Sequence, residues 1–347
     1  MHLAGWHPSL PKSSTMSEFR PSLMHFFNSF KESLFLGNPR WTPAEIPCLK
    51  DKVIIVTGGN SGIGYDTVKA LLEHEATVYI VSRNESKALP VIDELEKETG
   101  KRALYIQAEL SDLSSVKRAA EQFLSKEDRL DILYNNAGIV YPFATTPEGN
   151  DLIFETNVTG HFYFTTLLLP LLLSTAKTAA PGTVRIINVS SSAHRLVPAT
   201  NPLKLDAIQE GPLRDQVLRM YGYGFSKFCS NLYTNELARR YKDTNIVVMS
   251  VHPGCFHTSM TDHMPQTLAN RMINKIIFIY SPDYKAYTQL WAGTAPEAGK
   301  LHGKYITPWN SVGNPRAETQ DEGLMTELWT YLEGRVKAHE LKQVEGA

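Results

Sequence analysis

The chain has 347 residues, of which 42% are hydrophobic and 20% charged, so it holds enough apolar sequence for a full globular core. Its formal net charge of −1 gives no electrostatic basis for binding nucleic acid or an anionic membrane. The three cysteines, Cys48, Cys229 and Cys255, lie far apart, which excludes a disulfide framework and a zinc knuckle and predicts a reducing, cytoplasmic location.

Residues 1–49 are expected to form an N-terminal extension and linker. The spaced Phe, Leu and Met of residues 17–36 predict a helix that packs on the body of the protein, and weak association with a membrane surface is the alternative. Prolines make residues 37–47 an extended linker. No apolar run approaches the ~20 residues that span a bilayer, so no transmembrane segment is predicted.

From residue 52 the chain alternates between apolar, β-branched runs and segments with helical periodicity. The predicted strands cover residues 53–57, 77–81, 103–107, 130–135, 184–190, 246–251 and 304–307. The predicted helices cover residues 65–75, 85–98, 113–126, 151–174 and 222–241, and Pro90 suggests a kink or a late start in the second of them. The alternation predicts an α/β fold: a single Rossmann-type, doubly wound parallel sheet of about seven strands, within residues 50–312, with helices on both faces. Residues 313–347 are expected to form a helical tail.

The string TGGNSGIG at residues 57–64 follows the first predicted strand and opens a helix. Glycines in this context allow the backbone to approach a pyrophosphate, and the helix N-terminus supplies N–H donors. We therefore expect a dinucleotide to be bound by Gly58, Asn60, Ser61, Gly62, Ile63 and Gly64.

The end of the second predicted strand indicates which nicotinamide cofactor is used. An NAD enzyme places a carboxylate there, whereas this chain has Ser82 followed by Arg83. A guanidinium can bind the 2′-phosphate of NADP, although a single Arg can also be a solvated loop charge. The absence of an acidic residue at position 82 favours NADP over NAD.

Tyr223 and Lys227 are four residues apart within YGYGFSK, so they share one face of the predicted helix. A phenol can give a proton to a carbonyl oxygen, and a neighbouring ammonium group is expected to lower its pKa. Tyr221 has Phe225 at the corresponding spacing and is not a candidate.

These strings, together with NNAG at 135–138, Asn157 in TNVTG, NVSS at 188–191 and HPG at 252–254, resemble the short-chain dehydrogenase/reductase family over residues 50–310. Within the family the chain looks most like retinol-dehydrogenase-type and fungal short-chain reductases. The resemblance implies an enzyme that interconverts an alcohol and a carbonyl. Dimers or tetramers through the helices around 151–174 and 222–241 are common in the family.

The resemblance also implies individual roles. Ser191 would orient the substrate oxygen, with Ser190 and Ser192 as competitors, and Asn157 would hold a helix bulge and a proton-relaying water. The residues that would contact the cofactor, besides Tyr223 and Lys227, are Asn135, Asn136, Ala137, Gly138, Pro253, Gly254 and Thr258, with Glu109 and Leu110 at the adenine. Glu109 stands where relatives usually have Asp, which puts the adenine contact in doubt. The histidines 252, 257 and 263 have no carboxylate partner at metal spacing, so no metal site is predicted.

Residues 194–220 and 259–282 are expected to form loops beside the substrate. Met260, Met264, Leu268, Met272 and Ile276 either line an apolar pocket or pack beneath a lid or against another subunit. The leading hypothesis is an NADP(H)-dependent oxidoreductase for a small hydrophobic substrate, in secondary metabolism or detoxification. A retinoid- or steroid-directed dehydrogenase is the alternative substrate class, and a non-catalytic NADP-binding redox sensor is the alternative from another class.

Overall fold

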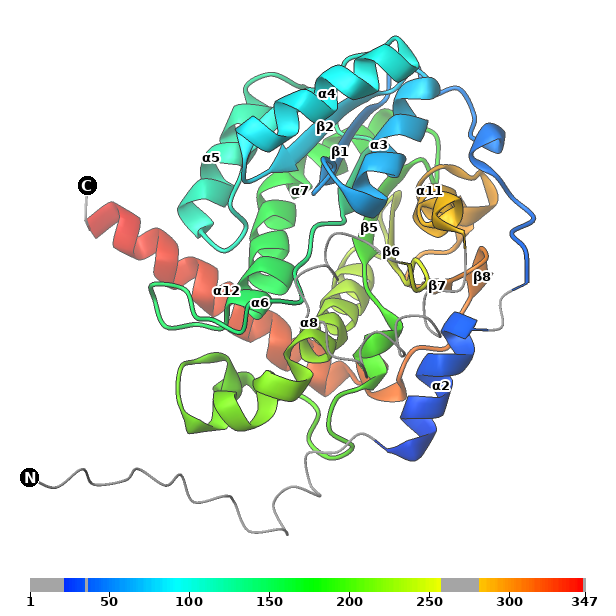
Figure 1. Cartoon of the computed structure of the whole chain (residues 1–347). Coiled ribbons are helices and arrows are strands. Elements are labelled where there is room, and N and C mark those ends of the chain that lie inside the picture. The colour runs from blue at the N-terminus through cyan, green and yellow to red at the C-terminus, as the bar shows by residue number, and fades with distance from the viewer. Residues whose placement is uncertain (1–21, 35–36, 257–280, 346–347) are drawn as a thin grey trace, which may run out of the picture.

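Eight strands form one sheet in the computed structural model, in the order β3-β2-β1-β4-β5-β6-β7-β8 (Figure 1). The structure describes residues 22–34, 37–256 and 281–345. All neighbouring strands are parallel except β7 and β8. The strands are β1 Val53–Thr57, β2 Thr77–Ser82, β3 Leu104–Gln107, β4 Ile132–Asn135, β5 Val184–Val189, β6 Ile246–Val251, β7 Tyr305–Thr307 and β8 Ser311–Val312.

The doubly wound α/β fold expected from the sequence is confirmed, and each of the seven predicted strands is present within two residues of its expected bounds. The sheet has one strand more than predicted. This strand, β8, has only two residues and pairs antiparallel to β7 at the edge. A two-residue strand has no alternating pattern that a sequence could reveal.

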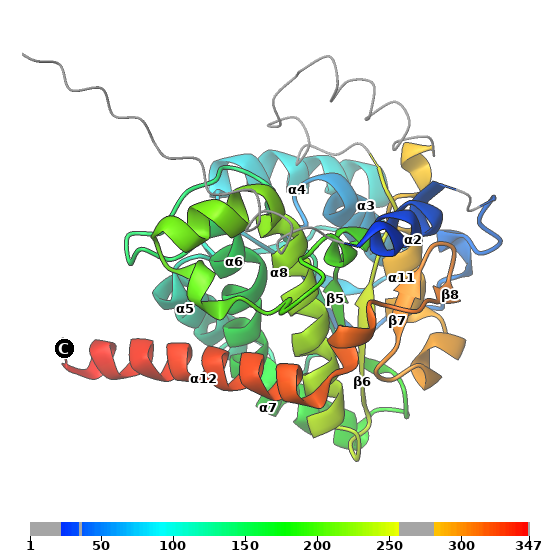
Figure 2. The ribbon, with the colours of Figure 1, turned by 90° about the horizontal axis from the view of Figure 1, so that it is seen from below.

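Helices cover both faces of the sheet because successive strand residues point to opposite sides. In β1, Val53 and Ile55 belong to one hydrophobic core and Ile54 and Val56 to the other. Helices α3 Gly62–Glu73, α4 Glu85–Thr99 and α11 Tyr287–Thr294 pack into the second core. Helices α5 Leu113–Leu124, α7 Gly160–Thr178, α8 Pro212–Arg240 and α12 Glu322–Glu345 pack into the first (Figures 1 and 2).

Apart from helix α2 Leu23–Leu34, the other elements within the described residues are short. They are the 3₁₀ turns η1 Pro43–Glu45, η3 Ser192–Arg195, η4 Leu205–Ile208, η5 Pro282–Tyr284, η6 Glu297–Lys300 and η7 Ala317–Gln320, the single turn α6 Leu152–Phe154, and the π-helix η2 Glu155–Thr159. The helical run from Leu152 to Thr178 is long and apolar enough to cross a membrane, but 67% of its most apolar window is buried within the protein. That burial is typical of the core helix of a globular domain.

The structure confirms the predicted start of one helix and corrects the predicted start of another. Helix α4 begins at Glu85, where the side chain of Asn84 caps it by accepting from Lys87 N at 3.2 Å, so Pro90 does not delay its start. Helix α8 begins at Pro212, ten residues before the predicted start. Pro at the first helical position is pre-organised for a helix because its missing N–H has no partner there in any case. The predicted loop 194–220 is therefore in part η3, η4 and the start of α8.

The start of α8 is fixed by a buried ion pair. Arg214 donates from Nε and Nη2 to Oδ2 of Asp151 at 3.1 and 2.9 Å, and both side chains are at most 6% exposed. The same guanidinium lies over the ring of Phe143. The segment that sequence reasoning assigned to a loop is thereby attached to the loop after β4.

Both flanking segments pack on the body. Helix α2, Leu23–Leu34, contacts η3 near the edge that carries β7 and β8 (Figures 1 and 2). Helix α12 crosses α8, where Trp329 stacks on Tyr233 with ring centroids 6.1 Å apart, and reaches α7, where Tyr163 donates to Glu340 at 3.0 Å. The C-terminal segment thus covers faces of the two helices through which dimers or tetramers commonly form in the family that the sequence resembles.

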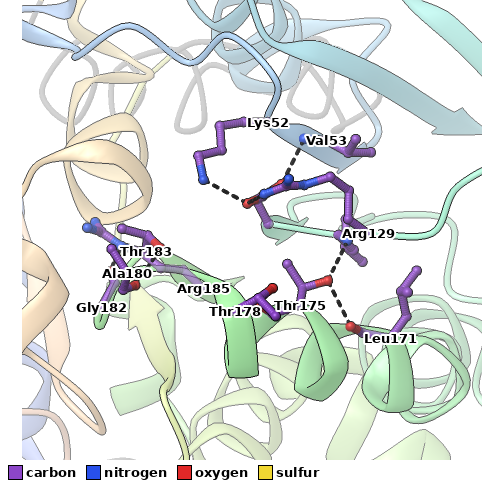
Figure 3. A network of polar contacts seen from close by, with 12 residues as sticks. Lys52, Val53, Arg129, Leu171, Thr175, Thr178, Ala180, Gly182, Thr183 and Arg185 are labelled. Carbon is purple, nitrogen blue, oxygen red and sulfur yellow. Dashed lines mark hydrogen bonds and ion pairs between the residues drawn. The ribbon is translucent and has the colours of Figure 1, made fainter.

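A network of charged side chains lies at the amino end of the sheet (Figure 3). The carboxylate of Asp131 is 1% exposed and accepts from Lys52 Nζ at 3.1 Å, Val53 N at 3.0 Å and Arg129 Nη2 at 2.7 Å. Burial alone would raise the pKa of Asp131, but Arg129, the Val53 N–H and Lys52 outweigh it and hold the pKa below its ordinary value. This network lies at the end of the sheet opposite to the candidate site.

We expect Asp131→Asn to lower the free energy of unfolding by about 2 kcal/mol at neutral pH, because hydrogen bonds to a charged group are lost. The depressed pKa of Asp131 means that its stabilisation is complete above the ordinary aspartate pKa and is lost as the pH falls through the folded value. Urea unfolding at pH 7 and at about pH 3 tests both points. If the difference in unfolding free energy between the wild type and Asp131→Asn grew as the pH fell, this assignment would be contradicted.

Candidate active site at the carboxyl ends of the strands

The expected site residues gather at one edge of the sheet. Gly58, Arg83, Glu109, Asn136, Ser191 and Gly254 each follow the carboxyl end of a different strand, β1 to β6 in chain order, within three residues. Parallel strands end at the same edge, where ligands of open α/β sheets bind.

The glycine turn after β1 is tight. Gly58 and Gly62 have φ of +67° and +56°, a region that favours glycine. A Cβ on Gly64 would lie 2.2 Å from the carbonyl oxygen of Gly58. Ser61 precedes α3 without capping it through its side chain, so the helix presents its first N–H groups to the turn, beside Asn60 and Ile63. This arrangement fits a bound phosphate.

The turn is tied to the segment after β4. Asn136 N and Ala137 N both donate to Thr57 Oγ1 at 2.9 Å, and Asn136 Nδ2 donates to Thr57 O at 2.8 Å. A Cβ on Gly58 would lie 3.1 Å from Cα of Ala137. Two of the strings that are expected to bind the cofactor are therefore joined by hydrogen bonds.

Asn135 departs from the expected cofactor contact. Its side chain is buried, and Nδ2 donates to Thr165 Oγ1 at 2.8 Å and to Asn188 Oδ1 at 2.7 Å. The side chain of this last residue of β4 lies on the face of the sheet that α7 covers, where it joins β4 to β5.

An open cavity of about 470 Å³ lies at the ends of β2 and β3, lined by Arg83, Asn84, Glu85, Ser86, Gln107 and Glu109. The guanidinium of Arg83 is exposed and lies 4.0 Å from Oε2 of Glu109. The other carboxylate oxygen of Glu109 turns back and accepts from Ser111 Oγ at 3.0 Å. Leu110 beside it is buried. The guanidinium of Arg83 could bind a phosphate in this cavity, whereas the carboxylates of Glu85 and Glu109 would repel the phosphate.

Tyr223, Lys227 and Ser191 come together at the end of β5. The Ser191 hydroxyl is close enough to the Tyr223 phenol to lower its pKa, and Lys227 Nζ lies 5.7 Å from the centre of the Tyr223 ring. Lys227 Nζ donates to Val189 O at 2.7 Å. The hydroxyl of Ser190 instead donates to Lys227 O at 3.3 Å, so among these two serines Ser191 faces the phenol.

Both ionisable groups of this cluster have shifted pKa values. Burial raises the pKa of Tyr223 to about 12, against the hydrogen bond with Ser191, which lowers it. Burial lowers the pKa of Lys227 to about 8. The expectation that the ammonium group lowers the pKa of the phenol is therefore wrong for the protein alone, since desolvation of Tyr223 dominates.

Asn157 lies at the centre of the π-helix η2, next to this cluster. Its Oδ1 accepts from Ile139 N at 2.8 Å and its Nδ2 donates to Ser226 Oγ at 3.0 Å. A Cβ on Gly138 would lie 3.4 Å from Oδ1 of Asn157 and 3.5 Å from Nζ of Lys227. The bulge thus brings Asn157 within reach of the lysine, and π-helices are frequent at functional sites.

The bulge also contains a buried carboxylate that sequence reasoning missed. Glu155 lies 3.1 Å from Nη2 of Arg335, which comes from α12. Burial raises the pKa of Glu155 to about 7, and Arg335 opposes that rise. No local pattern in the sequence could indicate this pair, because its members are far apart in the chain.

His161 is a second residue of the site that sequence reasoning missed. It is buried, with Nε2 2.9 Å from Thr57 Oγ1 and Nδ1 3.2 Å from Asn157 O, and burial lowers its pKa to about 4. The neutral ring therefore joins the glycine turn to the π-helix. Its place four residues after Asn157 on a helix is the signal that could have revealed it.

Six of the candidate residues named from the sequence fall outside the described part of the chain. Thr258 and the five residues proposed to line an apolar pocket lie outside the described residues, whereas Pro253 and Gly254 follow β6 as expected. Within the described ranges, no three His, Cys, Asp or Glu side chains cluster in a way that could hold a metal ion.

Comparisons with known proteins agree with this geometry. The sequence model of the family described as short chain dehydrogenase matches residues 52–201. A short-chain dehydrogenase/reductase of Armillaria gallica is 43% identical over 311 residues, which cover 89% of this chain and 98% of that protein. An uncharacterized oxidoreductase of Schizosaccharomyces pombe is 38% identical over 88% of this chain and 90% of its own length. Among solved structures, the RhlG/NADP active-site complex of Pseudomonas aeruginosa has a TM-score of 0.59 and 27% identity, covering 74% of this chain and 94% of that one.

Proposed function

Since this chain belongs to the short-chain dehydrogenase/reductase family, and is therefore an oxidoreductase that acts on alcohol or carbonyl groups, we propose that it uses NADP(H) to interconvert a hydrophobic alcohol and its carbonyl. The observation that carries the proposal is the placement of Tyr223 beside the Ser191 hydroxyl, with Lys227 one helical turn away. The glycine turn and the open cavity beside Arg83 lie along the same edge of the sheet.

When bound, the reduced nicotinamide would supply the hydride. The N–H groups at the start of α3 and the turn from Gly58 to Gly64 would hold the pyrophosphate, because no N-cap side chain covers this helix N-terminus. Pro253 and Gly254 would border the nicotinamide.

In carbonyl reduction, Tyr223 would donate its phenolic proton to the carbonyl oxygen. A pKa raised to about 12 keeps the phenol protonated at neutral pH, which is the form a proton donor needs. Ser191 would orient the same oxygen, since its hydroxyl already meets the phenol. Lys227 would hold the ribose beside it.

Asn157 would connect this cluster to a supply of protons. A cavity of about 10 Å³ next to it is lined by Asn135, Ala137, Asn157, His161, Asn188, Val189, Ser230 and Tyr233. That volume accommodates about one water molecule, and the lining offers polar partners. We propose that it holds the relay water.

The preference for NADP rests on Arg83 and on the absence of a carboxylate at Ser82. The RhlG relative carries NADP in its structure, and its likeness supports the same cofactor here. Arg83 extends from the end of β2 into an open cavity where the helix α4 begins, so a 2′-phosphate there would meet both the guanidinium and a helix N-terminus.

We expect Arg83→Ala to raise KM for NADPH by roughly 10- to 100-fold, because a charge-assisted hydrogen bond contributes about 1.5–3 kcal/mol. KM for NADH should hardly change, since NADH has no 2′-phosphate. Arg102→Ala is the matched control, because Arg102 is an exposed arginine paired with Asp93 away from the cavity. Steady-state kinetics with both cofactors measure this, and an equal loss with NADH would contradict the assignment.

The function itself is tested by mixing the protein with NADPH or NADH and a panel of hydrophobic aldehydes and ketones, retinoid and steroid carbonyls included. We expect loss of absorbance at the reduced-nicotinamide band with some members of the panel, faster with NADPH. Binding of NADPH without turnover on any carbonyl would favour the non-catalytic redox sensor.

A further inference from the structure

The turn that carries Ser191 is fastened to the N-terminal helix. Ser191 is the N-cap of η3, with Oγ accepting from Ala193 N at 3.2 Å and its carbonyl oxygen 2.7 Å from His194 Nδ1. This one 3₁₀ turn ends at Arg195. Whatever fixes the far end of the turn therefore also fixes Ser191.

Helix α2 makes that attachment through two polar contacts. Arg195 donates from Nε to Oε2 of Glu32 at 3.3 Å, and its Nη2 donates to the other carboxylate oxygen, so the pair is bidentate. One turn earlier on α2, Ser29 Oγ donates to the carbonyl oxygen of Ser192 at 3.2 Å. Helix α2 therefore forms hydrogen bonds with the first and the last residue of η3, Ser192 and Arg195.

The ion pair is largely buried, at the wall of an open cavity that both side chains line. The side chain of Arg195 is 6% exposed and that of Glu32 16%, and Tyr305 OH donates to Oε2 of Glu32 at 3.4 Å. Arg195 also donates to the carbonyl oxygen of Asn314. Three further cationic or titratable groups, His25, Arg316 and His252, lie within electrostatic reach of this cluster. Glu32 supplies the carboxylate that Arg195 meets here, and removing it would leave a buried cation without its partner.

Of the two residues of the ion pair, Glu32 lies before the segment that the family's sequence model matches, whereas Arg195 lies within it. The family's sequence model begins at residue 52, twenty residues after Glu32, and Glu32 and Arg195 are 163 residues apart. A similar support acts from the other side, where Arg316 N donates to Nε2 of His194 at 3.0 Å. The turn is held between the two flanking segments of the chain.

We propose that Glu32 of α2 is a positioning residue for the reaction: by holding Arg195, it sets the place of the Ser191 hydroxyl relative to Tyr223. The N-terminal helix is then part of the active-site scaffold. This inference rests on the proposed function, since it concerns the efficiency of the same Ser191–Tyr223 pair. Misplacement of a catalytic group by about 1 Å can cost up to roughly 100-fold in rate.

The test uses the full chain in four forms: wild type, Glu32→Gln, Arg195→Met and the double variant. We expect each single variant to lower kcat by roughly 10- to 100-fold while the Kd of NADPH, measured by fluorescence, stays at the wild-type value. The double variant should lose no more than the worse single one, because both act through one pair. Lys31→Met, an exposed change on the same helix, should leave kcat unchanged.

Asp131→Asn is the control for general destabilisation. It also removes a buried carboxylate from two cations, but it does so at the end of the sheet opposite to Ser191. All variants are compared at a temperature where circular dichroism shows them folded. If Glu32→Gln keeps the wild-type kcat and only melts earlier, as Asp131→Asn should, the proposal is wrong. If the wild type itself turns over no carbonyl, it is the proposed function that fails.

Discussion

Tyr223→Phe is expected to lower kcat for carbonyl reduction by about 100- to 10,000-fold, the usual contribution of a positioned general acid. The phenol is the group that meets Ser191, and burial raises its pKa to about 12, so it remains a proton donor through the neutral range. The ring itself is kept in the variant. NADPH should therefore bind with unchanged affinity, which fluorescence titration and steady-state kinetics measure together.

Tyr221→Phe is the matched control, because it makes the same chemical change two residues earlier on α8. Tyr221 has Phe225 at the spacing where Tyr223 has Lys227, so this variant should keep its turnover. Equal losses in the two variants would mean that the helix is disturbed and that Tyr223 has no special role. Full activity of Tyr223→Phe would remove the phenol from the mechanism.

Gly64→Ala is expected to weaken NADPH binding by more than about ten-fold and to lower the free energy of unfolding by about 1–3 kcal/mol, the range for overpacking. The added methyl would lie 2.2 Å from Gly58 O and 2.7 Å from Nδ2 of Asn136. Backbone atoms cannot move aside as a flexible side chain can. The turn must therefore open, and the N–H groups at the start of α3 would then no longer point toward the pyrophosphate.

The control for this change is Gly334→Ala. Gly334 lies within α12, and a Cβ there would meet nothing within 4 Å. Alanine favours a helix over glycine by up to about 1 kcal/mol, so this variant should be slightly more stable and bind NADPH normally. Wild-type NADPH affinity in Gly64→Ala would mean that the pyrophosphate does not lie at this turn.

Much of the fold could be predicted because its signal is local. Strands such as β1 and β6 are continuous apolar runs whose bounds the structure reproduces. The errors also have local causes. Helix α8 begins earlier than predicted because Pro212 is a favourable first helical residue, whereas residues 194–220 had been expected to form a loop beside the substrate. The two residues of β8 were too few to show a period.

The candidate site divides in the same way. The glycine turn, Tyr223 and Lys227 were found from spacing, and the structure places them at one edge of the sheet. Contacts between distant segments have no such signal. Asn135 turned inward toward Asn188, and the Glu32–Arg195 pair joins residues 163 positions apart. The raised pKa of Tyr223 follows from burial, which spacing alone does not give.

The central claim is that Tyr223, Ser191 and Lys227 assist transfer of a hydride from NADPH to a carbonyl carbon. The most direct measurement uses NADPH labelled with deuterium at C4, on either face of the ring, together with a hydrophobic ketone or aldehyde that the protein reduces. We predict that mass spectrometry finds the deuterium on the carbinol carbon of the alcohol with one of the two labelled cofactors, and that Tyr223→Phe forms the same product far more slowly. NADPH that binds tightly but transfers no deuterium to any carbonyl of the panel would contradict the account.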